Sequence, residues 1–239
     1  MIPISEIFTT IQGEGPRSGV PSLFIRTYFC TLGCSWCDSK YTWQDQRNAK
    51  AGVDYREVSP ESLAGRILDR CSPNVVFTGG EPMIHQRELM KVIGLVGSGV
   101  SRFRGYRPYY EVETSGTIEP IRSFEDAVDS FNVSLKLRNS GNIGRIRLRP
   151  SVIRRFVALA NRHRAWFKFV IMDRMDIDEV DELVRMYDLP RDKVLLMPEG
   201  TSPEVLTERG KWLVEICKEK GYRFTTRLHI FLFGNRRGV

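Results

Sequence analysis

Residues 26–45 read RTYFCTLGCSWCDSKYTWQD and contain three of the five cysteines of the chain, Cys30, Cys34 and Cys37, spaced as C-x3-C-x2-C. Three thiols this close together indicate a metal site in an intracellular protein, because a disulfide framework needs an even set of cysteines spread along the chain. A [4Fe–4S] cluster normally takes four cysteine thiolates, so a cluster bound by three leaves one iron open to another molecule. The pattern therefore predicts a site of chemistry, much as an open ligand position does in a catalytic zinc enzyme.

Around this loop, short apolar strands alternate with amphipathic helices. Six or seven β-α units joined by right-handed crossovers predict an α/β fold, an incomplete (β/α)6-type parallel barrel that is open on one side. No repeat or linker divides the sequence, so we expect one domain over residues 1–239. Strands are predicted at 22–29, 74–78, 109–114, 131–136, 166–171, 193–197 and 223–231, and helices from 59 and near 89–96, 124–129, 151–162, 177–187 and 203–220.

Distinctive peptides follow the predicted strands. The cysteine loop follows the first strand, GGEP (79–82) the second, TSG (114–116) the third and MPEG (197–200) the sixth, while Lys136 ends the fourth. Ligands of parallel α/β sheets gather at the carboxyl ends of the strands. The sequence therefore predicts that these peptides line one cavity.

Composition limits the classes of partner. The 36 basic residues exceed the 29 acidic ones by 7, and residues 131–171 contain no Asp or Glu. A basic surface of this kind attracts nucleic acid, an acidic protein or an anionic small molecule, or it is simply a solvated face. No signal peptide or apolar run of membrane-spanning length is recognisable, so we expect a cytoplasmic protein with no membrane contact.

The cysteine spacing, with Trp36 directly before the last cysteine, resembles the signature of radical S-adenosylmethionine (SAM) enzymes, and GGEP resembles their segment for the SAM amino group. The resemblance implies a [4Fe–4S] cluster whose open iron binds SAM and whose electron cleaves it to a 5′-deoxyadenosyl radical. It also implies SAM contacts from Trp36, Gly80 and Glu81. The alternative is a zinc knuckle, but no fourth Cys or His stands nearby at ligand spacing.

Three segments resemble the 7-carboxy-7-deazaguanine synthase family: FTTIQGEGPRSGVPSLFIR (8–26), CDSKYTW (37–43) and the tail RLHIFLFGNRRGV (227–239). The resemblance runs from Ile7 to Val239. It implies a lyase that contracts 6-carboxy-5,6,7,8-tetrahydropterin to 7-carboxy-7-deazaguanine with loss of ammonia, on the route to queuosine-type bases. It further implies Mg²⁺, a flavodoxin-like electron donor and a homodimer, with nucleic acid not expected as a partner.

The same resemblance assigns the remaining site residues. Arg26 suits the substrate carboxylate because its planar fork binds two oxygens. Ser39 stands where the family has a threonine that binds Mg²⁺, and its hydroxyl can do the same. Taken singly, Arg26 can also be an ion-pair partner and Ser115 a helix cap. Substrate contacts are expected from Ile11, Gln12, Gly13, Glu14, Arg26, Thr78, His229 and the carboxylate of Val239, and further SAM contacts from Ser115, Ser134 and Lys136.

A second departure, after Ser39, and two rivals accompany this interpretation. The family usually reads SPK where this chain has SLK, with Leu135 in the middle. A radical SAM activase of another protein shares the cysteine spacing but has no use for the TIQGEG and RLHIF segments. A zinc-containing RNA-binding module using the arginines of residues 138–155 is the rival from another class. Cys71 and Cys217 are interpreted as small buried hydrophobes in helices.

Overall fold

The computed structural model describes residues 1–44, 54–99 and 107–239, and within them nine strands form one sheet in the order β3-β1-β2-β4-β5-β6-β7-β8-β9. All neighbours from β2 to β9 pair in parallel, whereas β1 pairs antiparallel with both β2 and β3. Among the strands of these described ranges, the two at the ends of the sheet do not pair with each other, so the predicted open α/β architecture is confirmed. The strands are β1 Ile2–Ile11, β2 Pro21–Thr27, β3 Arg56–Val58, β4 Asn74–Gly79, β5 Tyr109–Thr114, β6 Ser130–Val133, β7 Ala165–Ile171, β8 Val194–Pro198 and β9 Arg223–Phe224.

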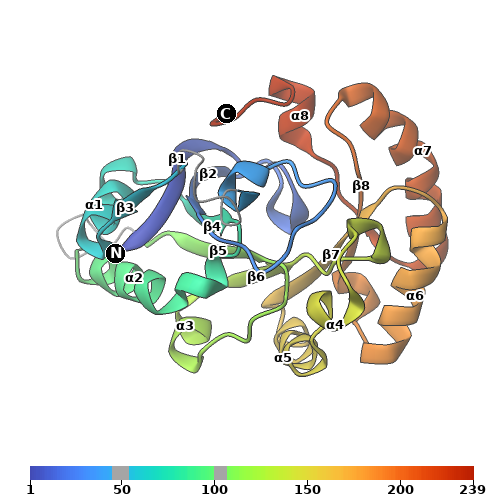
Figure 1. The fold of residues 1–239 in the computed structure, drawn as a ribbon, viewed down its shortest axis with the longest axis horizontal. Helices are drawn as coiled ribbons and strands as arrows, with labels where there is room; N and C mark the ends of the chain where they lie inside the picture. The colour runs from blue at the N-terminus through green and yellow to red at the C-terminus, as the bar shows by residue number, and fades with distance from the viewer. Residues whose placement is uncertain (45–53, 100–106) are drawn as a thin grey trace.

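Helices surround the strands in an arc, with α1, α2 and α3 at one side and α6 and α7 at the other (Figure 1). Predicted helix starts are confirmed where a serine caps a proline-initiated helix. The Ser59 side chain accepts from the Ser62 amide at 3.2 Å, and Ser202 accepts from the Val205 amide at 3.4 Å. The helices are α1 Pro60–Arg70, α2 Gln86–Gly99, α3 Arg122–Ala127, α4 Gly144–Arg147, α5 Pro150–Ala160, α6 Met175–Tyr187, α7 Pro203–Lys220 and α8 Leu228–Phe233.

The core lies between the sheet and these helices. Alternate apolar residues of the central strands, such as Phe77, Val112 and Phe167, are fully buried against helix residues such as Ile67 and Phe156. Burial on this scale is the main stabilising contribution to such a fold. None of the helices in the described ranges has the length and apolar character needed to span a membrane.

The predicted strand 223–231 is wrong beyond Phe224. The alternation in RLHIFLF favours a strand, but pairing with β8 ends as the Thr225 amide donates to the Leu196 carbonyl, and the chain then turns into α8. The Leu228 amide donates instead to the Gly13 carbonyl at 2.8 Å. A contact distant in sequence therefore replaces a local preference, and it brings the tail towards the TIQGEG segment.

Two further differences concern the first strand and a cysteine. The N-terminal residues form the long strand β1, which the sequence did not reveal because polar residues and a bulge between Ile4 and Glu6 interrupt its alternation. Cys71 is exposed and adopts a left-handed conformation just after α1, so its interpretation as a buried helical residue is wrong. Cys217 is buried in α7, as predicted.

Candidate functional site

A cavity of about 470 Å³ opens at the carboxyl ends of the parallel strands. All the predicted site residues border it except Glu81, although they come from positions between 11 and 239 of the chain. The shared position of the motifs is therefore confirmed. The bordering residues are Ile11, Gln12, Gly13, Glu14, Arg26, Cys30, Cys34, Trp36, Cys37, Ser39, Thr78, Gly80, Ser115, Ser134, Lys136, His229 and Val239.

Each of the three clustered cysteines accepts a hydrogen bond from an N–H group. The Leu32 amide donates to Cys30 Sγ at 3.4 Å, Asn142 Nδ2 to Cys34 Sγ at 3.3 Å and Trp43 Nε1 to Cys37 Sγ at 3.4 Å. Such donors stabilise negative charge on sulfur, and they tune iron–sulfur clusters in proteins. The donor set therefore fits three thiolates that bind a cluster.

Two of the three clustered thiols are shielded enough from solvent to change their acidity. Burial raises the pKa of Cys30 to about 12 and raises that of Cys34 as well, so both thiols keep their protons unless a metal ion replaces them. In the part of the chain that the structure describes, no three His, Cys, Asp or Glu side chains gather closely enough to bind a single metal ion. A cubane cluster places its irons at separate corners, so its ligands do not need to meet at one point.

The GGEP turn packs directly on the residues that lead into the cysteine loop. Gly79 adopts a φ of 120°, and a Cβ on Gly80 would lie 2.1 Å from the Phe29 carbonyl oxygen. The Gly80 amide donates to the Thr27 carbonyl at 3.1 Å and the Glu81 amide to the Phe29 carbonyl at 2.7 Å. Only glycine allows this close approach of two backbones.

Glu81 itself lies behind the cavity wall. Its carboxylate is fully buried and accepts from Thr114 Oγ1 at 2.8 Å, from the Ser115 amide at 2.8 Å and from Ser115 Oγ at 2.5 Å. In this arrangement Glu81 orients Ser115, which does border the cavity. The predicted contact of Glu81 with SAM stays a prediction.

Lys136 and Ser134 point into the same part of the cavity. Lys136 Nζ donates to Ser134 Oγ at 2.8 Å and lies 5.4 Å from the centre of the Trp36 ring. The departure at Leu135 does not displace them, since that side chain is buried in the core. Ser39 is half-buried beside the cysteine loop, with its Oγ 3.7 Å from Cys37 Sγ.

A carboxylate pair on β5 supports the TIQGEG segment. Gln12 Nε2 donates to Glu111 Oε1 at 2.5 Å and to Glu113 Oε1 at 3.2 Å, while Thr78 Oγ1 donates to Glu113 Oε2 at 2.7 Å. Asn132 Nδ2 also donates to Glu111 Oε1 at 2.5 Å. The network fixes the end of β1 against the central strands, and Glu113 borders the cavity.

Glu111 exchanges its proton near neutral pH. Complete burial, together with the charge of Glu113, raises its pKa to about 7. Among the described residues, Asn74 Oδ1 and Asn132 Oδ1 are buried without a hydrogen-bond partner. Exchanging the amide O and N of either side chain would give a protonated Glu111 an acceptor.

Stability is expected to depend on Glu111 between about pH 4.5 and 7. A carboxyl whose pKa is higher in the folded state binds its proton more tightly there, so the free energy of unfolding falls as pH rises through this window. A rise from 4.5 to about 7 corresponds to about 3 kcal/mol. Urea unfolding of the wild type and Glu111→Gln at pH 5 and pH 8 measures it. The variant gains stability relative to the wild type at the higher pH, and an unchanged difference would contradict the assignment.

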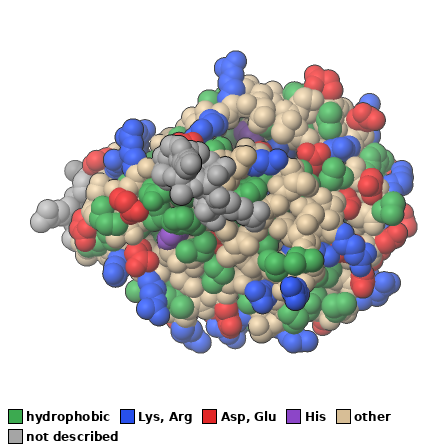
Figure 2. All heavy atoms as spheres, viewed as in Figure 1, with side chains coloured by type: hydrophobic (Ala, Val, Ile, Leu, Met, Phe, Trp, Pro, Cys, Tyr) green, Lys and Arg blue, Asp and Glu red, His purple; other side chains and the backbone are tan. Residues whose placement is uncertain are grey.

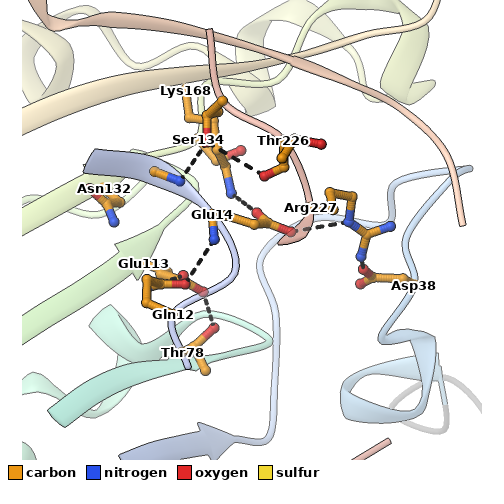
Figure 3. Close-up of polar contacts among 12 residues, drawn as sticks. Gln12, Glu14, Asp38, Thr78, Glu113, Asn132, Ser134, Lys168, Thr226 and Arg227 are labelled. Atoms are coloured by element: carbon orange, nitrogen blue, oxygen red, sulfur yellow. Dashed lines mark hydrogen bonds and ion pairs between the residues drawn. The ribbon is translucent and has the colours of Figure 1, made fainter. Parts of the chain in front are cut away.

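A chain of alternating charges crosses the cavity (Figure 3). Glu14 pairs with Lys168 of β7 and, at 3.1 Å, with Arg227 Nε, and Arg227 Nη2 pairs with Asp38 next to the last clustered cysteine. Although burial opposes ionisation, Lys168 and Arg227 hold the pKa of Glu14 well below its usual range. The chain connects the TIQGEG segment to the cysteine loop.

The C-terminal tail also borders the cavity, where Arg237 and Arg26 share the carboxylate of Glu6. Glu6 Oε2 accepts from Arg26 Nε at 3.0 Å and from the Tyr41 hydroxyl at 2.7 Å, and Glu6 Oε1 accepts from Arg237 Nε at 2.9 Å. His229 packs closely against Gly13, where any Cβ would meet its Nδ1 at 2.1 Å. Burial lowers the pKa of His229, which favours the neutral ring.

Sequence reasoning missed several charged residues that border the cavity. They are Glu6, Asp38, Glu113, Lys168, Glu199, Arg227, Arg236 and Arg237. A signal existed for Lys168, because it interrupts the apolar strand WFKFV, and for Glu113, because it shares a strand face with Glu111. Asp38 and Arg227 lie inside segments quoted for the family resemblance. Their pairing partners were not recognisable from sequence.

Comparison with known proteins agrees with this geometry. Residues 24–165 match the Radical SAM superfamily. A 7-carboxy-7-deazaguanine synthase of Pyrobaculum aerophilum is 36% identical over 241 residues, covering 99% of this chain and 97% of the relative. A relative of the same name from Rhodopirellula baltica is 32% identical over 248 residues, covering 99% of this chain and 88% of its own.

Solved structures also match this chain. The crystal structure of QueE from Escherichia coli matches with a TM-score of 0.68 at 28% identity, covering 95% of this chain and 94% of that one. Streptococcus suis SuiB bound to precursor peptide SuiA matches with a TM-score of 0.54 at 13% identity, covering 85% of this chain and 47% of SuiB, which shows the shared fold alone. The chain therefore belongs to the radical SAM superfamily and, within it, to the 7-carboxy-7-deazaguanine synthase family.

Proposed function

We propose that this protein is a radical SAM lyase that converts 6-carboxy-5,6,7,8-tetrahydropterin to 7-carboxy-7-deazaguanine with loss of ammonia. The observation that carries the proposal is the single cavity bordered by the three cysteines, the TIQGEG segment and the tail. Membership of the superfamily implies the [4Fe–4S] cluster and SAM, which supply a carbon-centred radical. The residues of this chain bind and orient the two ligands and exclude water.

Substrate binding falls to the polar groups on the TIQGEG side. Glu14 is held ionised by Lys168 and Arg227, so its carboxylate is an acceptor for the N–H groups of a pterin edge. Arg26 donates to Glu6 through its Nε. Within the described residues, neither of its Nη groups has a hydrogen bond. A substrate carboxylate can therefore take the free side of the guanidinium fork.

SAM is expected to bind to the cavity residues around the Gly79-Gly80 turn. The Gly79-Gly80 turn presents backbone to the cavity, and Ser115 is oriented by the buried Glu81. Ser134 and Lys136 add a hydroxyl and an ammonium group that suit a ribose and a carboxylate. Trp36 borders the same cavity.

Magnesium, the electron donor and the dimer are further parts of the proposal. Ser39 offers a hydroxyl oxygen at the cavity, next to the carboxylate of Asp38, and oxygen donors suit Mg²⁺. Without the β-methyl of threonine, the Ser39 rotamer is less restrained. A flavodoxin-like donor, a homodimer and the carboxylate of Val239 as a substrate contact remain predictions.

The test is anaerobic reconstitution of the cluster, then incubation with the carboxy-tetrahydropterin, SAM, dithionite and Mg²⁺, with mass spectrometry of the product. We expect 7-carboxy-7-deazaguanine and its loss when SAM is omitted. Absence of product from protein with an intact cluster, shown by its iron and sulfide content, would contradict the proposal. The colour of the reconstituted protein separates it from a zinc protein, which is colourless.

Substituting Glu14 by glutamine discriminates the activase alternative. The change keeps the size of the side chain and removes the charge that Lys168 and Arg227 stabilise. Pterin turnover should fall while reductive cleavage of SAM without substrate continues. An activase of another protein would keep its activity in this variant.

A further inference from the structure

The segment 138–149 packs against the outer side of the cysteine loop. Asn142 Oδ1 accepts from the Gly33 amide at 3.0 Å, the Ser140 carbonyl accepts from the Ser35 amide at 3.0 Å, and Asn139 Oδ1 accepts from Trp36 Nε1 at 3.1 Å. These contacts join two parts of the chain more than a hundred residues apart in sequence. The segment therefore forms the outer wall of the predicted cluster site.

A buried arginine makes this wall rigid. Arg147 Nη1 donates to the Lys136 carbonyl at 2.6 Å and Arg147 Nη2 to Glu179 Oε1 at 2.6 Å, and only 5% of the Arg147 side chain is exposed. The Arg138 amide donates to Glu179 Oε2 at 2.8 Å. The backbone of the segment is thus fixed at both ends, and the residues between present a defined surface.

That surface is basic around an apolar centre. Ile143 is 56% exposed, and Arg145 and Arg149 beside it are exposed with no ion pair among the described residues. Arg138 is exposed too, although it shares Glu179 and Glu182 on α6. In Figure 2, basic and hydrophobic side chains adjoin over the region where Figure 1 draws α4.

The Asn142 side chain connects this surface to Cys34, one of the predicted cluster ligands. Asn142 Nδ2 donates to Cys34 Sγ at 3.3 Å, and the next residue in the chain is the exposed Ile143. A protein seated on Ile143 is therefore separated from a cluster ligand by little more than the Asn142 side chain. None of residues 138–149 borders the cavity predicted for SAM and substrate, so a partner seated on them need not enter it.

We propose that the surface formed by Arg138, Ile143, Arg145 and Arg149 is the docking site of an acidic one-electron donor protein that reduces the cluster. This inference rests on the proposed function, because only a redox-active cluster needs such a partner. The donor loses one electron and the cluster gains it, with no bond made or broken. An apolar centre within a ring of one charge is typical of a specific but transient interface.

The composition of the segment favours a protein over nucleic acid. Residues 138–149 contain no aromatic side chain, whereas proteins that bind single strands stack bases on aromatic rings. An acidic protein surface accounts for the arginines by charge complementarity, and the apolar core of a protein interface accounts for Ile143.

The experiment compares two reductants in the reconstituted full-length protein. Turnover is measured with dithionite and with a reduced flavodoxin, for the wild type, Ile143→Ser and the double variant Arg145→Glu/Arg149→Glu. The matched control is Arg66→Glu/Arg87→Glu, which makes the same change in net charge on exposed residues of α1 and α2. The rate of cluster bleaching on mixing with flavodoxin gives a readout independent of product formation.

We expect the 145/149 variant to lose at least about tenfold in cluster reduction by flavodoxin, and the wild-type rate to fall as salt is raised. Dithionite-driven turnover and the control pair should stay within about twofold of the wild type. Equal losses in the control pair, or no loss with flavodoxin in the 145/149 variant, would each overturn the docking site. Failure of dithionite turnover in the wild type would instead contradict the proposed function.

Discussion

Replacing Gly80 by alanine is expected to abolish cluster-dependent turnover. The new Cβ would lie 2.1 Å from the Phe29 carbonyl oxygen and 3.1 Å from the Cys30 amide nitrogen, and neither backbone atom can move without displacing the cysteine loop. Phe29 already has a φ of 75°, which leaves it little freedom to adjust. Iron and sulfide content after reconstitution, together with product formation, measures the effect.

The matched control is Gly65→Ala in α1. A Cβ on Gly65 meets no atom within 4 Å, and alanine is the better helix former by about 1 kcal/mol. That variant should be as stable as the wild type or more so, with full cluster content. Normal cluster content and turnover in Gly80→Ala would show that the turn does not support the cysteine loop.

Replacing Arg227 by methionine should have the second-largest effect. The side chain is 8% exposed and pairs with both Glu14 and Asp38, and Arg227 Nη1 also donates to the Gly200 carbonyl at 2.7 Å. Removing one member of a buried ion network costs about 3–5 kcal/mol of stability when the remaining charge stays buried. We expect about 3 kcal/mol here, because Glu14 is buried but keeps Lys168 as a partner, and the Asp38 side chain is 39% exposed. We also expect turnover to fall about 100-fold or more, since Glu14 and Asp38 repel each other across the site.

Arg155→Met is the control outside the cavity. Arg155 donates to Glu125 through two bonds of 2.7 Å, so this variant loses a comparable ion pair. Denaturation by urea gives the stability change, and steady-state kinetics give the turnover of the folded fraction. The account predicts that Arg155→Met loses stability and keeps turnover. Equal turnover losses in the two variants would assign Arg227 a purely structural role.

Local patterns were sufficient where a motif sits at the end of its own strand. The cysteine spacing, the glycines of GGEP and the serines that cap α1 and α7 depend on neighbours in sequence, so the strand-end cavity could be predicted. The helix caps Ser59 and Ser202 illustrate this, since each accepts from an amide three residues later. Their geometry is decided locally.

Charged pairs across the cavity could not be predicted in the same way. Lys168 and Glu14 are 154 residues apart, and Arg227 and Glu14 are 213 apart, so only the folded sheet brings them together. The strand predicted for the C-terminal tail was wrong for the same reason. Its alternating pattern favours a strand, but the hydrogen bond from the Leu228 amide to the Gly13 carbonyl redirects the chain. The residues that complete the site are therefore brought together by tertiary contacts, which no local sequence pattern shows.

The most direct test of one shared cavity is an anaerobic crystal structure of the reconstituted protein with SAM and the carboxy-tetrahydropterin. The account predicts a [4Fe–4S] cluster on Cys30, Cys34 and Cys37, SAM along the wall of Gly80 and Ser134, and the pterin between Glu14 and Arg26. A pterin bound outside this cavity, or a single zinc ion on the three cysteines, would contradict it.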